Sequence, residues 1–171
     1  MKMKIKNAVW NNIFKVDPSD TTQTISILKQ VPIFNGLSDR DFNTMEKILH
    51  LREYEVDEFV FQSGTPGLGM YIIIQGEVVI KGENSKGEKI VFAQLFSGDF
   101  FGEVSLISED DRSTNAMAIS SCKLVAFFRS DLLEIITRSP KLGNKILLNL
   151  ATVLGNRLTK TNELLINGGT A

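Results

Sequence analysis

Apolar and polar positions divide the chain into a helical start, a strand-rich middle and a helical end. Apolar residues recur at helical spacing within Thr22–Lys29 and again after Ser38. Ser38 is followed three residues later by Asp41, the spacing of a capping box, which predicts a second helix beginning there. Pro32 and Gly36 interrupt the helical pattern between the two segments. The second helix has the apolar stripe Phe42, Met45, Ile48 and Leu49.

The middle of the chain, from Leu51 to Phe128, consists of short apolar runs separated by glycines. These runs are Tyr54–Phe61, Met70–Ile74, Val78–Ile80, Ile90–Phe96 and Leu124–Phe128. Many short strands with turn signals every ~8–12 residues are typical of an antiparallel sandwich or barrel. The pattern therefore predicts a mainly β fold with flanking helices.

Helical spacing returns after Arg129. Ser130 and Asp131 are the expected N-caps of a first helix, which Ser139 and Pro140 end. A last helix is predicted over Pro140–Leu165. Its apolar stripe, spaced close to 3.5 residues, is Leu147, Leu150, Leu154, Leu158, Thr161 and Leu165. The stripe either packs on its own domain or pairs with a second copy. We favour a parallel homodimer, because the stripe runs past the length that one small domain covers.

Composition restricts the class of protein. The 171 residues suit one domain over residues 21–166, with a leader at 1–20, for which disorder is the simplest interpretation, and a tail at 167–171. A net charge of −1 gives no electrostatic attraction to DNA or to an anionic membrane, so neither is an expected partner. The lone Cys122 forms no internal disulfide, and no apolar run approaches ~18 residues. We therefore expect a cytoplasmic protein.

The most informative chemistry lies between Phe101 and Thr114. Gly102 and Glu103 follow a short apolar segment, and a polar turn then leads to Arg112 and Ser113. Arginine offers a planar fork of donors that matches a phosphate, whereas an ionised glutamate accepts from a donor such as a ribose hydroxyl. Glycine lets the backbone approach a ligand closely. These residue types predict a pocket for a sugar phosphate.

The segment Phe101-Gly102-Glu103-Val104-Ser105-Leu106 followed by Arg112-Ser113 closely resembles the phosphate-binding cassette of cyclic nucleotide-binding domains. The resemblance implies a catabolite activator-like, eight-stranded antiparallel β-roll of the jelly-roll type over about residues 53–129, with C-terminal helices at 130–166. It also implies the ligand contacts. Gly102 and Glu103 would bind the ribose, and Arg112 and Ser113 would bind the cyclic phosphate with the backbone amides of Val104 and Ser105.

The last helix resembles, around Asn156–Leu165, the corresponding helix of bacterial catabolite-activator proteins. Thr161 and Asn162 then fall where that family contacts adenine, and Thr114 is a further candidate contact to the base. The resemblance favours cyclic AMP over cyclic GMP. No helix-turn-helix pattern follows Ile166, so a stand-alone module without a DNA-binding domain is expected.

Two interpretations of function remain open. The first is a non-enzymatic cyclic nucleotide sensor without a cofactor, signalling through its last helix to an unknown downstream protein. The second is a ligand-free β-roll that serves as a structural or protein-interaction module. The acidic turn Glu109-Asp110-Asp111 keeps the second open, since carboxylates facing the phosphate would oppose it. An enzyme is not expected, because the single histidine, His50, cannot form a histidine-rich metal site.

Overall fold

The computed structural model describes residues 18–84 and 86–167. Most of the expected leader, residues 1–17, and most of the expected tail, residues 168–171, lie outside the described residues. The first helix, α1 (Pro18–Leu28), begins four residues before the expected Thr22 and takes in the last part of the expected leader. A short 3-10 helix, η1 (Pro32–Phe34), follows it.

The second helix, α2 (Asp39–Met45), begins where the capping pattern predicts. The Ser38 amide donates to Asp41 Oδ2 at 2.8 Å, and the Asp41 amide donates to Ser38 Oγ at 3.3 Å. The Ser38 hydroxyl also donates to Asp41 Oδ2 at 2.7 Å, and the bonds that this carboxylate accepts from the Ser38 amide and then from the Ser38 hydroxyl lower the pKa of Asp41 below its usual value. A purely local signal was therefore sufficient to place this helix.

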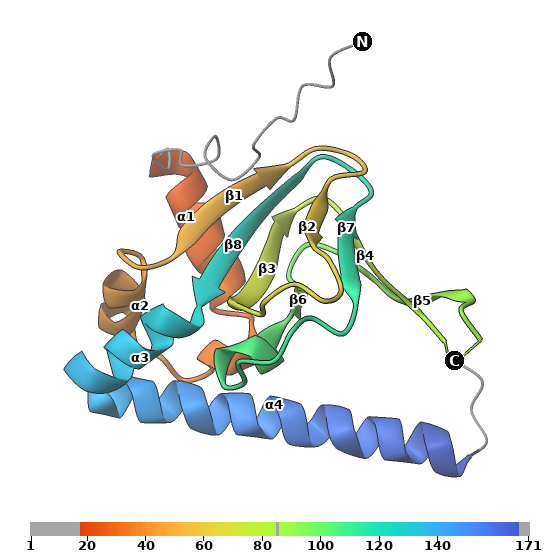
Figure 1. Ribbon diagram of the computed structural model, residues 1–171. Helices are drawn as coiled ribbons and strands as arrows, with labels where there is room; N and C mark the ends of the chain where they lie inside the picture. The colour runs from red at the N-terminus through yellow and green to blue at the C-terminus, as the bar shows by residue number, and fades with distance from the viewer. Residues whose placement is uncertain (1–17, 85, 168–171) are drawn as a thin grey trace.

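Eight antiparallel strands form two four-stranded sheets that enclose the middle of the domain (Figure 1). The first sheet has the order β1-β8-β3-β6 and the second the order β2-β7-β4-β5. The strands are β1 (His50–Tyr54), β2 (Phe59–Phe61), β3 (Gly69–Gln75), β4 (Val78–Glu83), β5 (Lys89–Leu95), β6 (Phe100–Phe101), β7 (Asn115–Ala118) and β8 (Cys122–Phe128). The predicted eight-stranded β-roll is confirmed.

The strand boundaries differ from the apolar pattern in two places. The run Tyr54–Phe61 is divided between β1 and β2 by a turn in which Asp57 has a φ of 67°. Aspartate tolerates this left-handed conformation better than most residues, so the turn forms without a glycine that would have indicated it in the sequence. The short strands β6 and β7 fell outside the five runs, because four residues or fewer carry too little periodicity.

The two sheets make two apolar cores. Strands β3 and β8 lie in the interior of the first sheet and are covered on both faces, which explains their continuous apolar sequence. On β8, Val125 and Phe127 face the helices, whereas Cys122 and Leu124 face the second sheet. The larger core therefore lies between the first sheet and the helices, and the smaller core lies inside the roll.

Two helices complete the fold. Helix α3 (Arg129–Arg138) begins before the expected caps; Asp131 lies within its first turn and accepts from the Phe128 amide at 2.9 Å. Helix α4 (Pro140–Ile166) has 27 residues and extends along one side of the roll (Figure 1). A Cβ at Gly143 would lie 2.8 Å from Ile136 Cα, so this glycine permits the close approach of α3 and α4. No described helix has the length and apolarity needed to cross a bilayer.

Candidate ligand-binding site

The candidate site begins at Gly102, where the chain leaves β6 and enters the 3-10 helix η2 (Glu103–Leu106). Gly102 has a φ of 76°, and a Cβ at this position would lie 2.6 Å from Arg112 Nη1. Both the left-handed backbone and the close approach of arginine require glycine here. The turn buries the side chains of Glu103 and Ser105 and leaves Val104 exposed.

Arg112 is the buried cation of the site, with only 7% of its surface exposed. Its Nη1 donates to Ser105 Oγ at 2.8 Å and to the Gly102 carbonyl at 3.2 Å, and its Nη2 donates to the Gly69 carbonyl at 2.6 Å. The guanidinium carbon lies 4.0 Å from the centre of the Phe61 ring, a cation–π contact. Nε is buried and has no hydrogen-bond partner. One strong donor of this arginine is therefore unsatisfied.

Burial lowers the pKa of Arg112, while the nearby Tyr71 and Glu103 act in the opposite direction. Arginine nevertheless keeps its proton at neutral pH, because its usual pKa is far above 7. The site therefore holds a positive charge of low mobility, fixed by carbonyls, a hydroxyl and an aromatic ring. Such a charge is preorganised for an anion.

Glu103 is also buried, and its cation partner comes from the distal part of α4. Arg157 Nη1 lies 2.6 Å from Glu103 Oε1, and Arg157 Nη2 donates to the Phe100 carbonyl at 3.2 Å. The Arg157 guanidinium also lies 4.9 Å from the Phe100 ring centre. The carboxylate expected to hold a ribose is thus tied to the C-terminal helix.

These residues surround one cavity of about 380 Å³. All of the sequence-derived phosphate and ribose candidates line it, together with Thr114 from the candidates for the base; the full set is Gly102, Glu103, Val104, Ser105, Arg112, Ser113 and Thr114. The Ser105 amide already donates to the Gly102 carbonyl at 3.2 Å. An apolar wall completes the cavity and consists of Phe61, Ile80, Ala93, Leu95, Phe100 and Phe101.

Thr161 and Asn162 are not among the residues that line this cavity. Both are exposed on α4, and Thr161 Oγ1 donates to the Arg157 carbonyl one turn earlier. Conversely, Arg157 and the apolar wall were not among the site residues that the sequence suggested. Arg157 is the only arginine of α4, and an arginine beside the leucine stripe was the available signal.

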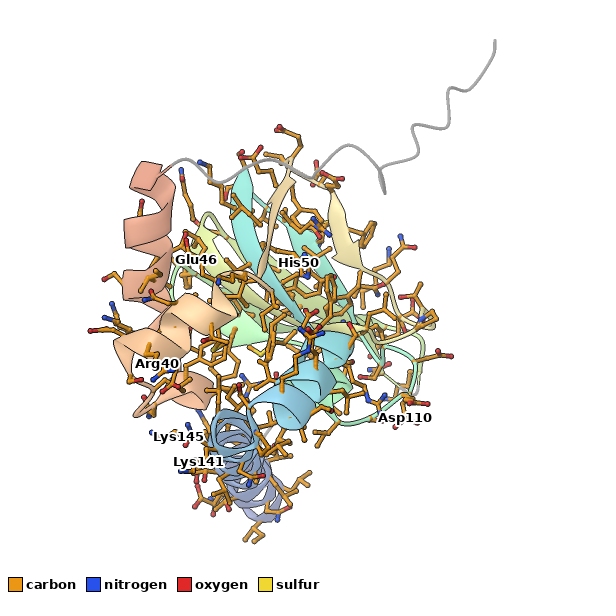
Figure 2. All side chains as sticks on the ribbon, turned by 90° about the vertical axis from the view of Figure 1, so that its left-hand side faces the viewer. Arg40, Glu46, His50, Asp110, Lys141 and Lys145 are labelled. Carbon is orange, nitrogen blue, oxygen red and sulfur yellow. The ribbon has the colours of Figure 1, made fainter. Side chains whose placement is uncertain are left out.

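The structure separates the three carboxylates of the acidic turn. Glu109 Oε1 lies 2.7 Å from Arg129 Nη1 at the start of α3 and does not line the cavity. Asp110 and Asp111 do line it, and both are exposed. The Ser108 hydroxyl donates to the Asp110 carboxylate. Figure 2 shows Asp110 at the periphery of the molecule, on the opposite side from Arg40 and Lys145.

The described residues offer little for metal-dependent chemistry. They contain no group of three or more histidine, cysteine and acidic side chains placed to hold a metal ion. His50 lies instead on β1, with Nε2 3.4 Å from Asp131 Oδ2 and its ring 4.9 Å from that of Phe128. The cavity instead combines guanidinium groups, which can contact an anion, with carboxylate oxygens, which can accept from hydroxyl groups.

Comparison with known proteins places the chain in a family. Residues 51–139, more than half of the chain, match the cyclic nucleotide-binding domain. The chain therefore belongs to the cyclic nucleotide-binding domain family. It is 31% identical over 135 residues to the cyclic AMP receptor protein of Thermus thermophilus, covering 79% of this chain and 61% of that protein.

Two solved structures extend the comparison. The regulatory domain of Toxoplasma gondii PKA with cAMP has a TM-score of 0.65 and 27% identity, covering 71% of this chain and 46% of that one. A cyclic nucleotide-binding domain from Methylobacillus flagellatus has a TM-score of 0.77 at 21% identity, covering 90% and 86% of the two chains, which shows the shared fold. The chain spans less than two thirds of the length of the first curated relatives it matches.

Proposed function

We propose that this protein is a non-catalytic regulatory module that binds a cyclic nucleotide, cyclic AMP in preference to cyclic GMP, and signals through α4. The observation that carries the proposal is that Arg112 and Glu103 both line one cavity. Arg112 supplies a fixed guanidinium charge for a phosphate, and Glu103 supplies carboxylate oxygens for a ribose hydroxyl. Membership of the family supports this choice of ligand.

The preference for cyclic AMP is supported by relatives. The Thermus relative is named a cyclic AMP receptor protein, and the Toxoplasma regulatory domain was crystallised with cyclic AMP. In this chain, Thr114 lines the cavity, and Thr161 and Asn162 lie on α4 just beyond Arg157. We assign these three residues to contacts with the base. Thr161 and Asn162 would reach it if α4 moved toward the cavity, or if the α4 of a second copy supplied them.

Signalling through α4 is supported by the contact between Arg157 and Glu103. A ribose hydroxyl that donates to Glu103 would share the carboxylate with Arg157 or displace it. The ligand would then bind one position of α4 better than another, which is the requirement for a switch. The exposed stripe residues Leu158 and Leu165 support a further step, a homodimer through the distal part of α4.

The proposal is tested by calorimetric titration of nucleotide-free protein with cyclic AMP and then cyclic GMP. We expect cyclic AMP to bind more tightly, and Arg112→Ala to weaken it about 10- to 150-fold, because a charge-assisted contact contributes about 1.5–3 kcal/mol. Glu103→Gln should weaken binding less. Arg138→Ala is the matched control, since Arg138 pairs with Glu134 on the surface of α3. Thermal unfolding of each variant checks that it is folded.

The alternative function, a ligand-free interaction module, has one observation in its favour. Asp110 and Asp111 line the cavity, and the Glu103 carboxylate already forms an ion pair with Arg157. Absence of heat up to millimolar ligand, from protein shown to be folded and empty, would exclude the sensor and leave this alternative.

A further inference from the structure

The charges around the cavity are unusual for a site that binds an anion. Its lining includes two arginines, Arg112 and Arg157, and three carboxylates, Glu103, Asp110 and Asp111. Arg157 is paired with Glu103 at 2.6 Å, so these two charges compensate each other. Arg112 is then the remaining cation of a lining that also contains two aspartates, and the lining carries one net negative charge.

The two aspartates are not compensated by a neighbouring cation. Within residues 18–84 and 86–167, Glu109 has Arg129 at 2.7 Å, whereas neither Asp110 nor Asp111 forms an ion pair. Backbone contacts hold the turn in place: the Gly67 amide donates to the Asp110 carbonyl at 3.3 Å, and Asp111 pairs with Pro66 in an isolated bridge. The backbone of the turn is thus held at the cavity, and both aspartates line the same cavity as Arg112.

We propose that Asp110 and Asp111 are specificity residues that admit a cyclic phosphodiester with one negative charge and disfavour 5′-nucleotides. This inference rests on the proposed function of the site. A 5′-monophosphate carries close to two negative charges at neutral pH, because its second pKa is about 6. Arg112 can balance one negative charge of the ligand, and the two aspartates repel each additional negative charge. The selection acts on ligand charge and is independent of the base.

The size of the effect follows from Coulomb's law. One carboxylate about 7 Å from a ligand charge in water-like surroundings changes affinity by about threefold for each unit of ligand charge. Removing the charge of one carboxylate should therefore raise the affinity for cyclic AMP about threefold and the affinity for 5′-AMP nearly tenfold. The dissociation constant of 5′-AMP divided by that of cyclic AMP should then fall about threefold when one aspartate is neutralised, and about tenfold when both are.

The test measures dissociation constants of cyclic AMP, by titration, and of 5′-AMP, by competition, for wild type, Asp110→Asn, Asp111→Asn and the double variant. Glu109→Gln is the matched control, because it removes a charge from the same turn but outside the cavity. We expect the control to keep the wild-type ratio. In wild type, ~1 M salt should lower the preference for cyclic AMP, since the Debye length is then about 3 Å.

Each outcome is decisive. A ratio that falls in the asparagine variants but not in Glu109→Gln supports the inference, as does the salt dependence in wild type, which needs no variant to fold. An equal gain in affinity for cyclic AMP and 5′-AMP, or an unchanged ratio of their dissociation constants, in variants shown to be folded overturns the inference. The proposed function as a cyclic nucleotide sensor would then still stand. Failure of wild type and of the asparagine variants to bind either nucleotide instead refutes the proposed function, and this inference with it.

Discussion

The proximal part of α4, residues 140–154, and its distal part, residues 155–166, share one apolar stripe but have different surroundings. In the proximal part Leu150 of the stripe is buried in the larger core, beside Leu142 and Ile146 from the neighbouring positions. The stripe residues Leu147 and Leu154 are partly buried against the same core. In the distal part every residue is exposed, including Leu158 at 63% and Leu165 at 73%. The same sequence pattern therefore stabilises the domain in one part and leaves an apolar surface in the other.

The polar contacts of the two parts differ in the same way. The proximal Asn149 donates to the carbonyls of Ile33 and Asn35, which fixes α4 to the N-terminal segment. The distal part makes hydrogen bonds to the roll through Arg157. A helix anchored at one end and joined to the candidate site by one side chain at the other can respond locally to a ligand without unfolding the domain.

The largest expected effect is on stability, and it should be confined to the proximal part. Leu150→Ala should lower the free energy of unfolding by about 2–5 kcal/mol, because a buried leucine leaves a cavity in the core. Leu158→Ala should change it by less than about 0.5 kcal/mol, since the side chain is exposed. Urea unfolding at low protein concentration measures both. Similar losses for the two variants would contradict the division of α4.

The two glycines of α4 give a second, smaller contrast. Gly143→Ala should destabilise the protein by about 1–3 kcal/mol, because the added Cβ would lie 2.8 Å from Ile136 Cα and Cγ1. Gly155→Ala meets open space and should stabilise the helix by up to about 1 kcal/mol. Thermal unfolding midpoints should therefore move in opposite directions. A midpoint for Gly143→Ala that rises or stays unchanged would show that the helix contact is not tight.

The sequence was sufficient wherever the determining contacts are local. The cap of α2 uses Ser38 and Asp41, three residues apart, and the cassette from Phe101 to Ser113 presents its chemistry in one short segment. The start of α3 was misplaced because Ser130 and Asp131 both suit an N-cap, whereas the N-cap is Phe128, whose amide donates to Asp131 in the first turn.

Contacts between distant segments were beyond the sequence pattern. Arg157 lies 54 residues from Glu103, and nothing along α4 indicates which carboxylate its guanidinium meets. The orientation of Glu109 likewise depends on Arg129, which only the packing of α3 brings within 2.7 Å. The apolar wall comes from β2, β4, β5 and β6, so its composition follows from strand order rather than from any motif.

A third prediction concerns Arg157, the link between the distal part of α4 and the candidate site. Arg157→Gln should reduce stability by only about 1–2 kcal/mol, by leaving the buried Glu103 without its cation. Amide hydrogen exchange should rise across residues 155–166 and stay unchanged across residues 140–154. Arg138→Gln, which removes a surface pair on α3, is the control. Equal exchange in wild type and Arg157→Gln would mean that this contact does not hold the distal helix.

The smallest effect on folding, and the most informative about partners, is expected from the exposed stripe. Leu158→Gln should leave the unfolding free energy within about 0.5 kcal/mol of wild type, but it should weaken a homodimer formed through α4. Leu148→Gln is the matched control, because Leu148 is 70% exposed yet lies outside the stripe in the proximal part. Sedimentation at micromolar concentration, with and without cyclic AMP, should give a dimer for wild type and Leu148→Gln, and a larger monomer fraction for Leu158→Gln. A wild-type monomer under both conditions would remove the homodimer. The exposed stripe would then need a different protein to cover it, and signalling through α4 would depend on that partner rather than on a second copy.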